Sequence, residues 1–336
     1  VHDAEGKEIP LTHGNYIALL ENQNRDIRKE AFENLYSVYK QFSNTLSAAF
    51  GANVKQAVFY AKARNYTSSR QSSLSGNEVP ESVYDNLVAS VRKSLPLLHR
   101  YASLRKKLLG VEELHMYDLY VPMVAEADRH YTFEEAKDIV KTGLAPMGEE
   151  YLGLLQEGFD NRWIDIYENE GKRSGAYSWG VYGCHPYVLL NFHGTLNDVF
   201  TLAHELGHAF HNQCLTGHRP LNRDYSMPLA ETASTFNECV VMAAAIDAAQ
   251  DPEEKMALVE SQLQDITQVI CDIYSRYRFE TKVFDHREEQ FMNAETLCGF
   301  MTEAQKQSYG DGLDPDCLHP YMWVCKSHYY GTPFYN

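Results

Sequence analysis

Two histidines and a glutamate, His204, Glu205 and His208, lie within five consecutive residues of this chain. On an α-helix, residues four apart differ by about 40° around the axis, so both imidazoles project from one side. They can then hold one metal ion, and Glu205 is placed to accept a proton from a water molecule beside that ion. The pattern therefore requires a helix here and favours metal-dependent hydrolysis. The alternative is a helix with two ordinary packing or surface histidines.

The residues around this motif also predict a helix. Thr195 or Asn197 can cap its N-terminus. Apolar residues flank the motif on both sides, namely Val199, Phe200, Leu202, Ala203, Leu206 and Phe210. Such a helix can bury its apolar residues while the histidines stay accessible.

A catalytic zinc ion normally takes three protein ligands and leaves the fourth position to water. A metzincin pattern is excluded, because it requires histidine where this chain has Cys214. His211 shares the helix face, but three ligands on one straight helix give poor tetrahedral geometry, so it is expected to pack or to support a ligand. Glu231, on a predicted helix after Pro228, is the better third ligand, and Asp224 lies in a loop-like stretch.

A second acidic residue, Glu238, lies two helical turns beyond Glu231 on the same side of that predicted helix. Two interpretations are open. Glu238 either orients a ligand histidine, which usually donates its other N–H group to such a partner, or it is an ordinary surface carboxylate. The chain has no Gly-x-Ser-x-Gly motif, phosphate-binding loop or dinucleotide-binding fingerprint that would indicate a competing chemistry.

Hydrophobic periodicity makes most of the remaining chain helical. A capping-box pattern starts a short helix at Thr132, and Pro96 is expected to kink or divide the helix that contains it. Helices are predicted over residues 25–50, 80–110, 196–214, 228–249, 252–290 and 295–308. Residues 163–191 differ, with strands near 163–167 and 187–190 around a flexible loop rich in Gly, Ser and Tyr at 171–183. We therefore expect a mainly α fold with a small sheet just before the motif helix.

Composition excludes several classes of protein. The chain has 30 basic and 46 acidic residues, and this net charge of -16 argues against nucleic acid as a partner. No apolar run is long enough to cross a membrane, and no signal-peptide pattern is present. The seven cysteines form no CxxC pair, so we expect buried thiols in a reducing compartment. Because the chain opens on Val1 without an initiating Met, it is expected to be a fragment.

Longer stretches of the sequence resemble the M3 family of metallopeptidases, most of all its oligoendopeptidase F branch. The stretches are residues 204–211 and 230–238, then 171–177 and 185–191 upstream, and 11–16 near the start. The resemblance thus covers nearly the whole chain. It implies a gluzincin-like, mainly helical zincin fold with a small sheet beside the HExxH helix, a deep substrate channel and a cytoplasmic location.

The resemblance also implies the metal and its ligands. One Zn²⁺ per chain would be held by His204, His208 and Glu231, with Glu205 as the general base. Near the C-terminus, residues 328–335 resemble the segment in which a histidine and a tyrosine donate hydrogen bonds to the oxyanion. The histidine would be His328, and the tyrosine would be Tyr335 or a residue beyond the end of this chain.

The same resemblance implies how a substrate would bind. The strand at 187–191 resembles an edge strand that pairs with the substrate backbone. Tyr187, Leu189 and Asn191, together with Tyr177, are therefore expected to contact the substrate.

These observations lead to one main hypothesis and two rivals. We expect residues 1–125 to form a helical channel wall and residues 126–336 to form the zinc-binding region, with the N-terminal region of the family absent. The expected function is a zinc endopeptidase that hydrolyses internal bonds of short oligopeptides, with no nucleic-acid or membrane partner. The rivals are a zinc exopeptidase, and a zinc-containing peptide-binding protein or inactive fragment. The sequence leaves the oligomeric state open.

Overall fold

The computed structural model divides the chain into two compact units. It describes residues 1–336 except 3–4, 125–129, 288–289, 315–318, 332 and 335–336. Unit 1 comprises residues 1–11, 19–121 and 263–336, and unit 2 comprises residues 12–18 and 122–262. The predicted division at residue 125 stays a prediction. The chain passes from unit 1 to unit 2 for the second time between residues 121 and 122, and its C-terminal segment returns to unit 1 from residue 263. It does so because its helices pack against helices of the N-terminal region.

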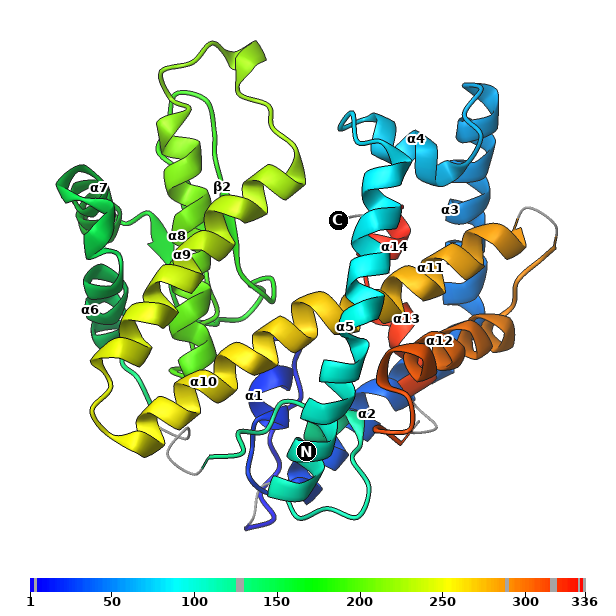
Figure 1. The fold of residues 1–336 in the computed structure, drawn as a ribbon, viewed down its shortest axis with the longest axis horizontal. Coiled ribbons are helices and arrows are strands. Elements are labelled where there is room, and N and C mark those ends of the chain that lie inside the picture. Colours follow the sequence, from blue (N-terminus) through cyan, green and yellow to red (C-terminus); the bar gives the residue numbers. More distant parts are fainter. Residues whose placement is uncertain (3–4, 125–129, 288–289, 315–318, 332, 335–336) are drawn as a thin grey trace. The chain divides into compact units, whose positions relative to one another are not determined.

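Unit 1 is built mainly from helices (Figure 1). They are α2 (Arg25–Gln41), α3 (Ser43–Ala63), α4 (Ser69–Ser75), α5 (Glu81–Leu108), α11 (Ile273–Arg287), α12 (Ala294–Tyr309), α13 (Met322–Cys325) and α14 (His328–Gly331), with 3-10 turns at Met116–Asp118 and His319–Tyr321. Phe50 of α3 stacks on Phe279 and Trp323, with ring centroids 6.2 and 6.0 Å apart. Tyr329 packs against Phe50 and Phe279, so this aromatic core holds the short helix α14 in place.

Two helix predictions in unit 1 differ from the structure. The helix expected over 25–50 is interrupted at Phe42, whose backbone angles of -100° and 4° end α2 and precede α3. Pro96 lies inside α5, which continues through it, so of the predicted kink or division only the division is wrong. The neighbouring residues Leu95 and Leu98 are buried, and this apolar burial offsets the helix hydrogen bond that proline cannot make.

Unit 2 contains the motif helix and the helices around it. These are α6 (Phe133–Gly143), α7 (Glu149–Asp160), α8 (Leu196–Cys214), α9 (Met227–Ala248) and most of α10 (Pro252–Ile266), with 3-10 turns at Ala145–Met147 and Pro220–Asn222. The short helix α1 (Tyr16–Leu20) spans a junction between the units. α6 begins at the predicted capping box of Thr132 and Glu135. α10 continues through a π-helical turn at Thr267–Asp272 into α11, close to the single helix predicted over 252–290.

A three-stranded sheet precedes α8 in unit 2. Its strands β1 (Ile164–Asp165), β2 (Tyr177–Trp179) and β3 (Tyr187–Leu189) have the order β1-β3-β2. β3 is parallel to β1 and antiparallel to β2. The prediction of a loop over 171–183 was wrong, because it contains β2. β2 has three residues, so its alternation of exposed and half-buried side chains was too short to recognise in the sequence. It begins shortly after Gly175, which adopts a φ of +81°.

The core of unit 2 lies between the sheet and its helices. Val188 and Leu190 belong to one buried cluster with Leu202 and Leu206 of α8 and Val241 of α9. The inward face of β3 therefore supports the helix that carries the HExxH motif. The expected fold class, mainly α with a small sheet beside the motif helix, is confirmed.

Two expectations from composition have different outcomes. Burial of all the cysteines was wrong, because Cys184, Cys214 and Cys239 are exposed, while Cys271 is buried and Cys317 lies outside the described residues. No helix within the described part of the chain is both long and apolar enough to cross a membrane.

Gly207 is where the close packing of α8 against α9 can be tested. A Cβ atom there would lie 2.6 Å from the Ala233 carbonyl oxygen and 2.7 Å from Ser234 Cα, both backbone atoms of α9. We predict that Gly207→Ala destabilises the chain by about 1–3 kcal/mol, because overpacking outweighs the gain in helix propensity. Urea unfolding would measure this change.

The matched control is Gly153→Ala in the interior of α7. A Cβ at Gly153 would meet nothing within 4 Å, so this change should be neutral or stabilising by up to about 1 kcal/mol. Equal destabilisation by both substitutions would contradict the proposed close approach at Gly207.

Candidate metal centre

The motif helix α8 begins at a capping box. The Thr195 side chain accepts a hydrogen bond from the Asp198 N–H at 3.2 Å, and the Asp198 carboxylate accepts the Thr195 N–H at 2.9 Å. The same carboxylate accepts the N–H of His193 at 2.9 Å. This cap satisfies backbone donors at the helix start and fixes where α8 leaves the sheet, so Thr195 rather than Asn197 is the cap.

Three side chains from two helices converge beside this helix. His204 and His208 come from α8, and Glu231 comes from the second turn of α9. The two histidine Nε2 atoms are 3.2 Å apart, and Glu231 Oε2 lies 3.3 Å from that of His204 and 3.4 Å from that of His208. The three residues are half-buried and form a group able to hold a metal ion. The structure therefore brings together all three predicted ligands.

The size of this triangle can be compared with that of a zinc site. Zinc bonds to histidine nitrogen and carboxylate oxygen are about 2.0–2.1 Å long, so two ligand atoms of a regular tetrahedron lie about 3.3–3.4 Å apart. The observed separations of 3.2, 3.3 and 3.4 Å match that edge length. The donors therefore fit one face of a zinc tetrahedron, with the fourth corner left for water.

A serine that the sequence reading did not single out positions Glu231. Ser234 is fully buried, and its hydroxyl donates to Glu231 Oε2 at 2.8 Å. Hydrogen bonds from His204, then from His208, hold the pKa of Glu231 well below its usual range despite partial burial. Glu231 is thus a fixed carboxylate. The sequence does carry a signal for this contact, because Ser234 follows Glu231 by three residues and so lies on the same helix face.

Glu238 contacts the other side of the His204 ring. Its Oε1 lies 2.5 Å from His204 Nδ1, so the imidazole lies between two carboxylates. Burial disfavours the charged ring, but hydrogen bonds with Glu231 and Glu238 outweigh it and raise the pKa of His204 to about 10. Without a metal the ring therefore carries a proton on each nitrogen. Of the two interpretations of Glu238, this contact favours the one in which it orients His204.

Glu205 is the buried acid of the motif. It is 5% exposed, and its Oε2 atom is buried with no hydrogen-bond partner among the described residues. Burial raises the pKa of its carboxyl group, and the nearby Glu231 and Glu238 act in the same direction. A carboxylate whose pKa is shifted towards neutrality suits proton transfer.

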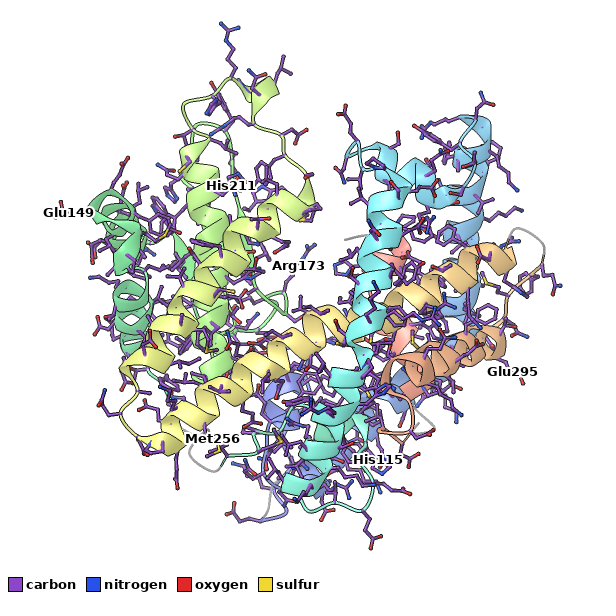
Figure 2. All side chains as sticks on the ribbon, viewed as in Figure 1. His115, Glu149, Arg173, His211, Met256 and Glu295 are labelled. Atoms are coloured by element: carbon purple, nitrogen blue, oxygen red, sulfur yellow. The ribbon has the colours of Figure 1, made fainter. Side chains whose placement is uncertain are left out.

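His211 is not part of the metal-binding group. It lies one turn beyond His208 on α8 (Figure 2), and its ring stacks on Tyr225 with centroids 4.2 Å apart and planes at 30°. Burial lowers the pKa of its imidazole, with the nearby His208 as a second cause. These contacts are those of a packing histidine, which is one of the two roles expected from the sequence.

The strand at 187–191 was expected to be an edge strand, and that expectation was wrong. β3 is the central strand, because both its neighbours pair with it. The N–H of Val188 donates to Trp163 O and that of Leu190 to Asp165 O, both at 2.8 Å on the β1 side. Backbone groups alternate along a strand, so those of Leu189 point to β2. β3 therefore has no free backbone edge to offer a substrate.

The edge strands are β1 and β2, and of these β2 contacts the motif helix α8. Tyr177 pairs with Leu189 and Trp179 pairs with Tyr187, so the backbone groups of Tyr177 and Trp179 face β3. The N–H and C=O of Ser178 then point away from the sheet. Among the described residues no strand covers this side of β2.

The predicted substrate-contact residues have different surroundings. Tyr177 and Tyr187 are exposed and Leu189 is half-buried. The amide of Asn191 donates to the carbonyls of Arg173 and Gly175 at 2.9 and 2.8 Å. Asn191 therefore ties down the loop before β2, and its Oδ1 atom is buried with no hydrogen-bond partner among the described residues.

The predicted oxyanion donors, His328 and Tyr335, belong to the C-terminal part of the sequence. His328 begins α14 in unit 1. Burial lowers the pKa of its imidazole, and Arg276 and Lys326 act in the same direction, so the ring is neutral at pH 7. A neutral ring has one N–H to donate. Tyr335 lies outside the described residues, so its predicted role, like that of His328, stays a prediction.

Comparison with known proteins gives consistent matches. A model of peptidase family M3 matches residues 18–336. Oligopeptidase PepF of Bacillus subtilis (strain 168) is 41% identical over 332 residues, which are 98% of this chain and 50% of that protein. The chromosomal oligoendopeptidase F of Lactococcus lactis subsp. cremoris is 39% identical over 327 residues, which are 97% of this chain and 54% of that protein.

A solved structure agrees with these relatives. The crystal structure of oligoendopeptidase-F from Enterococcus faecium superposes with a TM-score of 0.73 at 33% identity, covering 99% of this chain and 54% of that chain. The chain thus spans about half the length of the relatives it matches.

The protonation of His204 leads to a prediction about pH. Below a pKa of about 10 the ring carries a proton on Nε2 that a metal ion must displace. Binding should therefore release about one proton, and affinity for zinc should rise about tenfold per pH unit between pH 6 and 8. Calorimetry in buffers of different ionisation enthalpy would measure this release. Binding without proton release would contradict a metal site on His204.

Removing the carboxylate behind the ligand tests the role of Glu238. Glu238→Gln should weaken zinc binding about 10–100-fold, because the ring loses the partner that orients it. Asp247→Asn is the matched control, an exposed carboxylate on the same helix, and should change nothing. Equal affinities of both variants and the wild type would contradict an orienting role for Glu238.

Proposed function

The chain belongs to peptidase family M3, and from this membership we propose that it carries the catalytic centre of a zinc endopeptidase. Its substrates would be short oligopeptides, which it hydrolyses at internal bonds, with one zinc ion per chain. The single observation that carries the proposal is the triangle of His204, His208 and Glu231, whose edges fit tetrahedral zinc, with Glu205 beside it. The cytoplasmic location expected from the sequence stays a prediction.

The reaction assigns one role to each part of this centre. A zinc ion held by the three donors would supply Lewis acidity and lower the pKa of its water to near 7. Glu205 removes a proton from the water that attacks the scissile carbonyl carbon. It then gives this proton to the leaving nitrogen as the C–N bond breaks. Among the described residues the buried Oε2 of Glu205 has no hydrogen-bond partner, which supports this role because no such bond competes with the proton transfer.

The remaining residues of the centre keep the donors in place. Glu238 holds His204 so that Nε2 faces the metal position, and Ser234 holds Glu231. Fixed donors reduce the reorganisation needed in the transition state. In the same proposal His328 donates its N–H to the developing oxyanion, and loss of such a donor typically costs about 10²–10³ in kcat. A His328→Ala variant that retained the full kcat would exclude this role.

β2 offers a way to hold an extended peptide. The outward N–H and C=O of Ser178 can pair with a substrate backbone, which gives affinity with little dependence on side chains. Gly180, just after the strand, lies against Asn212 of α8, and the Asn212 amide donates to the His208 carbonyl at 3.0 Å. A peptide aligned along β2 would therefore run beside the metal-binding helix.

Two rival functions make different predictions for a peptide blocked at both ends. An exopeptidase needs a free amino or carboxyl terminus and would leave such a peptide intact. A peptide-binding protein would bind it without cleaving it. An endopeptidase would cut it at an internal bond.

The test is cleavage of a doubly blocked, internally quenched peptide of nine residues by the zinc-loaded chain. We expect Glu205→Gln to retain zinc, because Glu205 is not a ligand, and to lose about 10²–10⁴ of kcat with the proton shuttle. Metal analysis of both proteins is the control. Zinc binding with no cleavage by the wild type would reject the proposed activity for this chain, and equal cleavage by both would reject Glu205 as the base.

A further inference from the structure

The outer face of the small sheet in unit 2 carries exposed aromatic side chains. Trp179 is 66% exposed, and Tyr177 and Tyr187 are 42% and 48% exposed. Trp179 of β2 lies directly opposite Tyr187 of β3 in the sheet register. We call Tyr177, Trp179 and Tyr187 the aromatic face.

This face is separate from the packed side of the sheet. Side chains alternate along a strand, so Ser178 and its partner Val188 point to the opposite side. Val188 is 2% exposed and belongs to the core with α8. The aromatic face therefore takes no part in packing the sheet against the motif helix. The large apolar surface of this face stays exposed to water.

The position of β2 places this face close to the metal centre. Gly180 follows the strand directly, and a side chain there would collide with Asn212 of α8. Asn212 is one helical turn, about 6 Å, beyond His208, and it lies on the same side of the helix. The end of β2 is thus close to the metal ligands within one unit of the structure.

The geometry of strand pairing determines which side chains of a bound peptide meet the aromatic face. A peptide residue held opposite Ser178 points its side chain to the packed side. The residues before and after it lie beside Tyr177 and Trp179 and point to the aromatic face. Cross-strand neighbours of this kind have Cβ atoms about 4.5–5.5 Å apart, within reach of ring-to-ring contact.

We propose that Tyr177 and Trp179 select peptides with aromatic side chains at two positions separated by one residue. This inference rests on the proposed function, since it assigns a substrate class to the same centre. Ser178 supplies backbone pairing that accepts any sequence, and the two aromatic residues on either side supply the preference. Each aromatic pair is expected to raise affinity about threefold to tenfold over alanine.

The tryptophans of the chain give a direct readout of this contact. Trp163 and Trp323 are 2% and 0% exposed, so among the three tryptophans only Trp179 is open to a quencher in water. Acrylamide quenching of the intrinsic fluorescence therefore reports on Trp179. The experiment uses the zinc-loaded Glu205→Gln chain and two blocked nonapeptides, one with Phe and one with Ala at the two alternate positions.

We expect the Phe peptide to shield Trp179 from acrylamide and to bind about 10–50-fold more tightly than the Ala peptide. Trp179→Ala should reduce that preference about fivefold, and Trp179→Phe should largely restore it. Tyr167→Ala is the matched control, because Tyr167 is 58% exposed in the same unit but lies outside the three strands. Its substitution should leave the preference unchanged.

Several results would overturn the inference. They are equal binding of the two peptides, binding of neither, and a preference that Trp179→Ala leaves unchanged. Shielding of Trp179 that grows with protein concentration in the absence of peptide would instead assign the face to self-association. Cleavage of the Ala peptide by the wild-type chain is followed separately. Its absence would count against the proposed function, while the binding preference tests the aromatic face alone.

Discussion

The close approach of α8 and α9 at Gly207 is the constraint on which the metal centre depends. A side chain at this position would collide with backbone atoms of Ala233 and Ser234. Because the helices pack this closely, Glu231 from α9 reaches the two histidines of α8 at 3.3 and 3.4 Å. The glycine inside the HExxH motif is therefore structural, and the geometry of the three donors depends on helix packing rather than on any loop.

Three carboxylates also lie close together in the metal centre, where burial makes their negative charge energetically costly. Glu205, Glu231 and Glu238 surround His204, whose protonated imidazole compensates part of their charge when no metal is bound. A divalent cation at the three donors would supply the missing positive charge. The negative charge of these carboxylates is thus best compensated when a metal ion is bound. The carboxylates that hold His204 in place also favour its protonated form, so a proton competes with the metal for this ring.

Local sequence patterns predicted what local interactions determine. Three features could be predicted from the sequence because each depends on helix geometry. They are the spacing of His204 and His208, the cap at Thr195 and the acidic residue on the next helix. The pairing order of the three short strands could not be predicted, since non-local contacts set it, and β3 was taken for an edge strand although the edges are β1 and β2. The support that Ser234 gives Glu231 also became visible only once the donors were placed in space.

We propose that one zinc ion is held by His204, His208 and Glu231. The decisive test is a crystal structure of the zinc-loaded chain with anomalous data at the zinc edge. We expect one peak per chain, about 2.0–2.1 Å from both histidine Nε2 atoms and from one oxygen of Glu231. No peak at this position, or zinc bound elsewhere with Glu231 turned away, would contradict it.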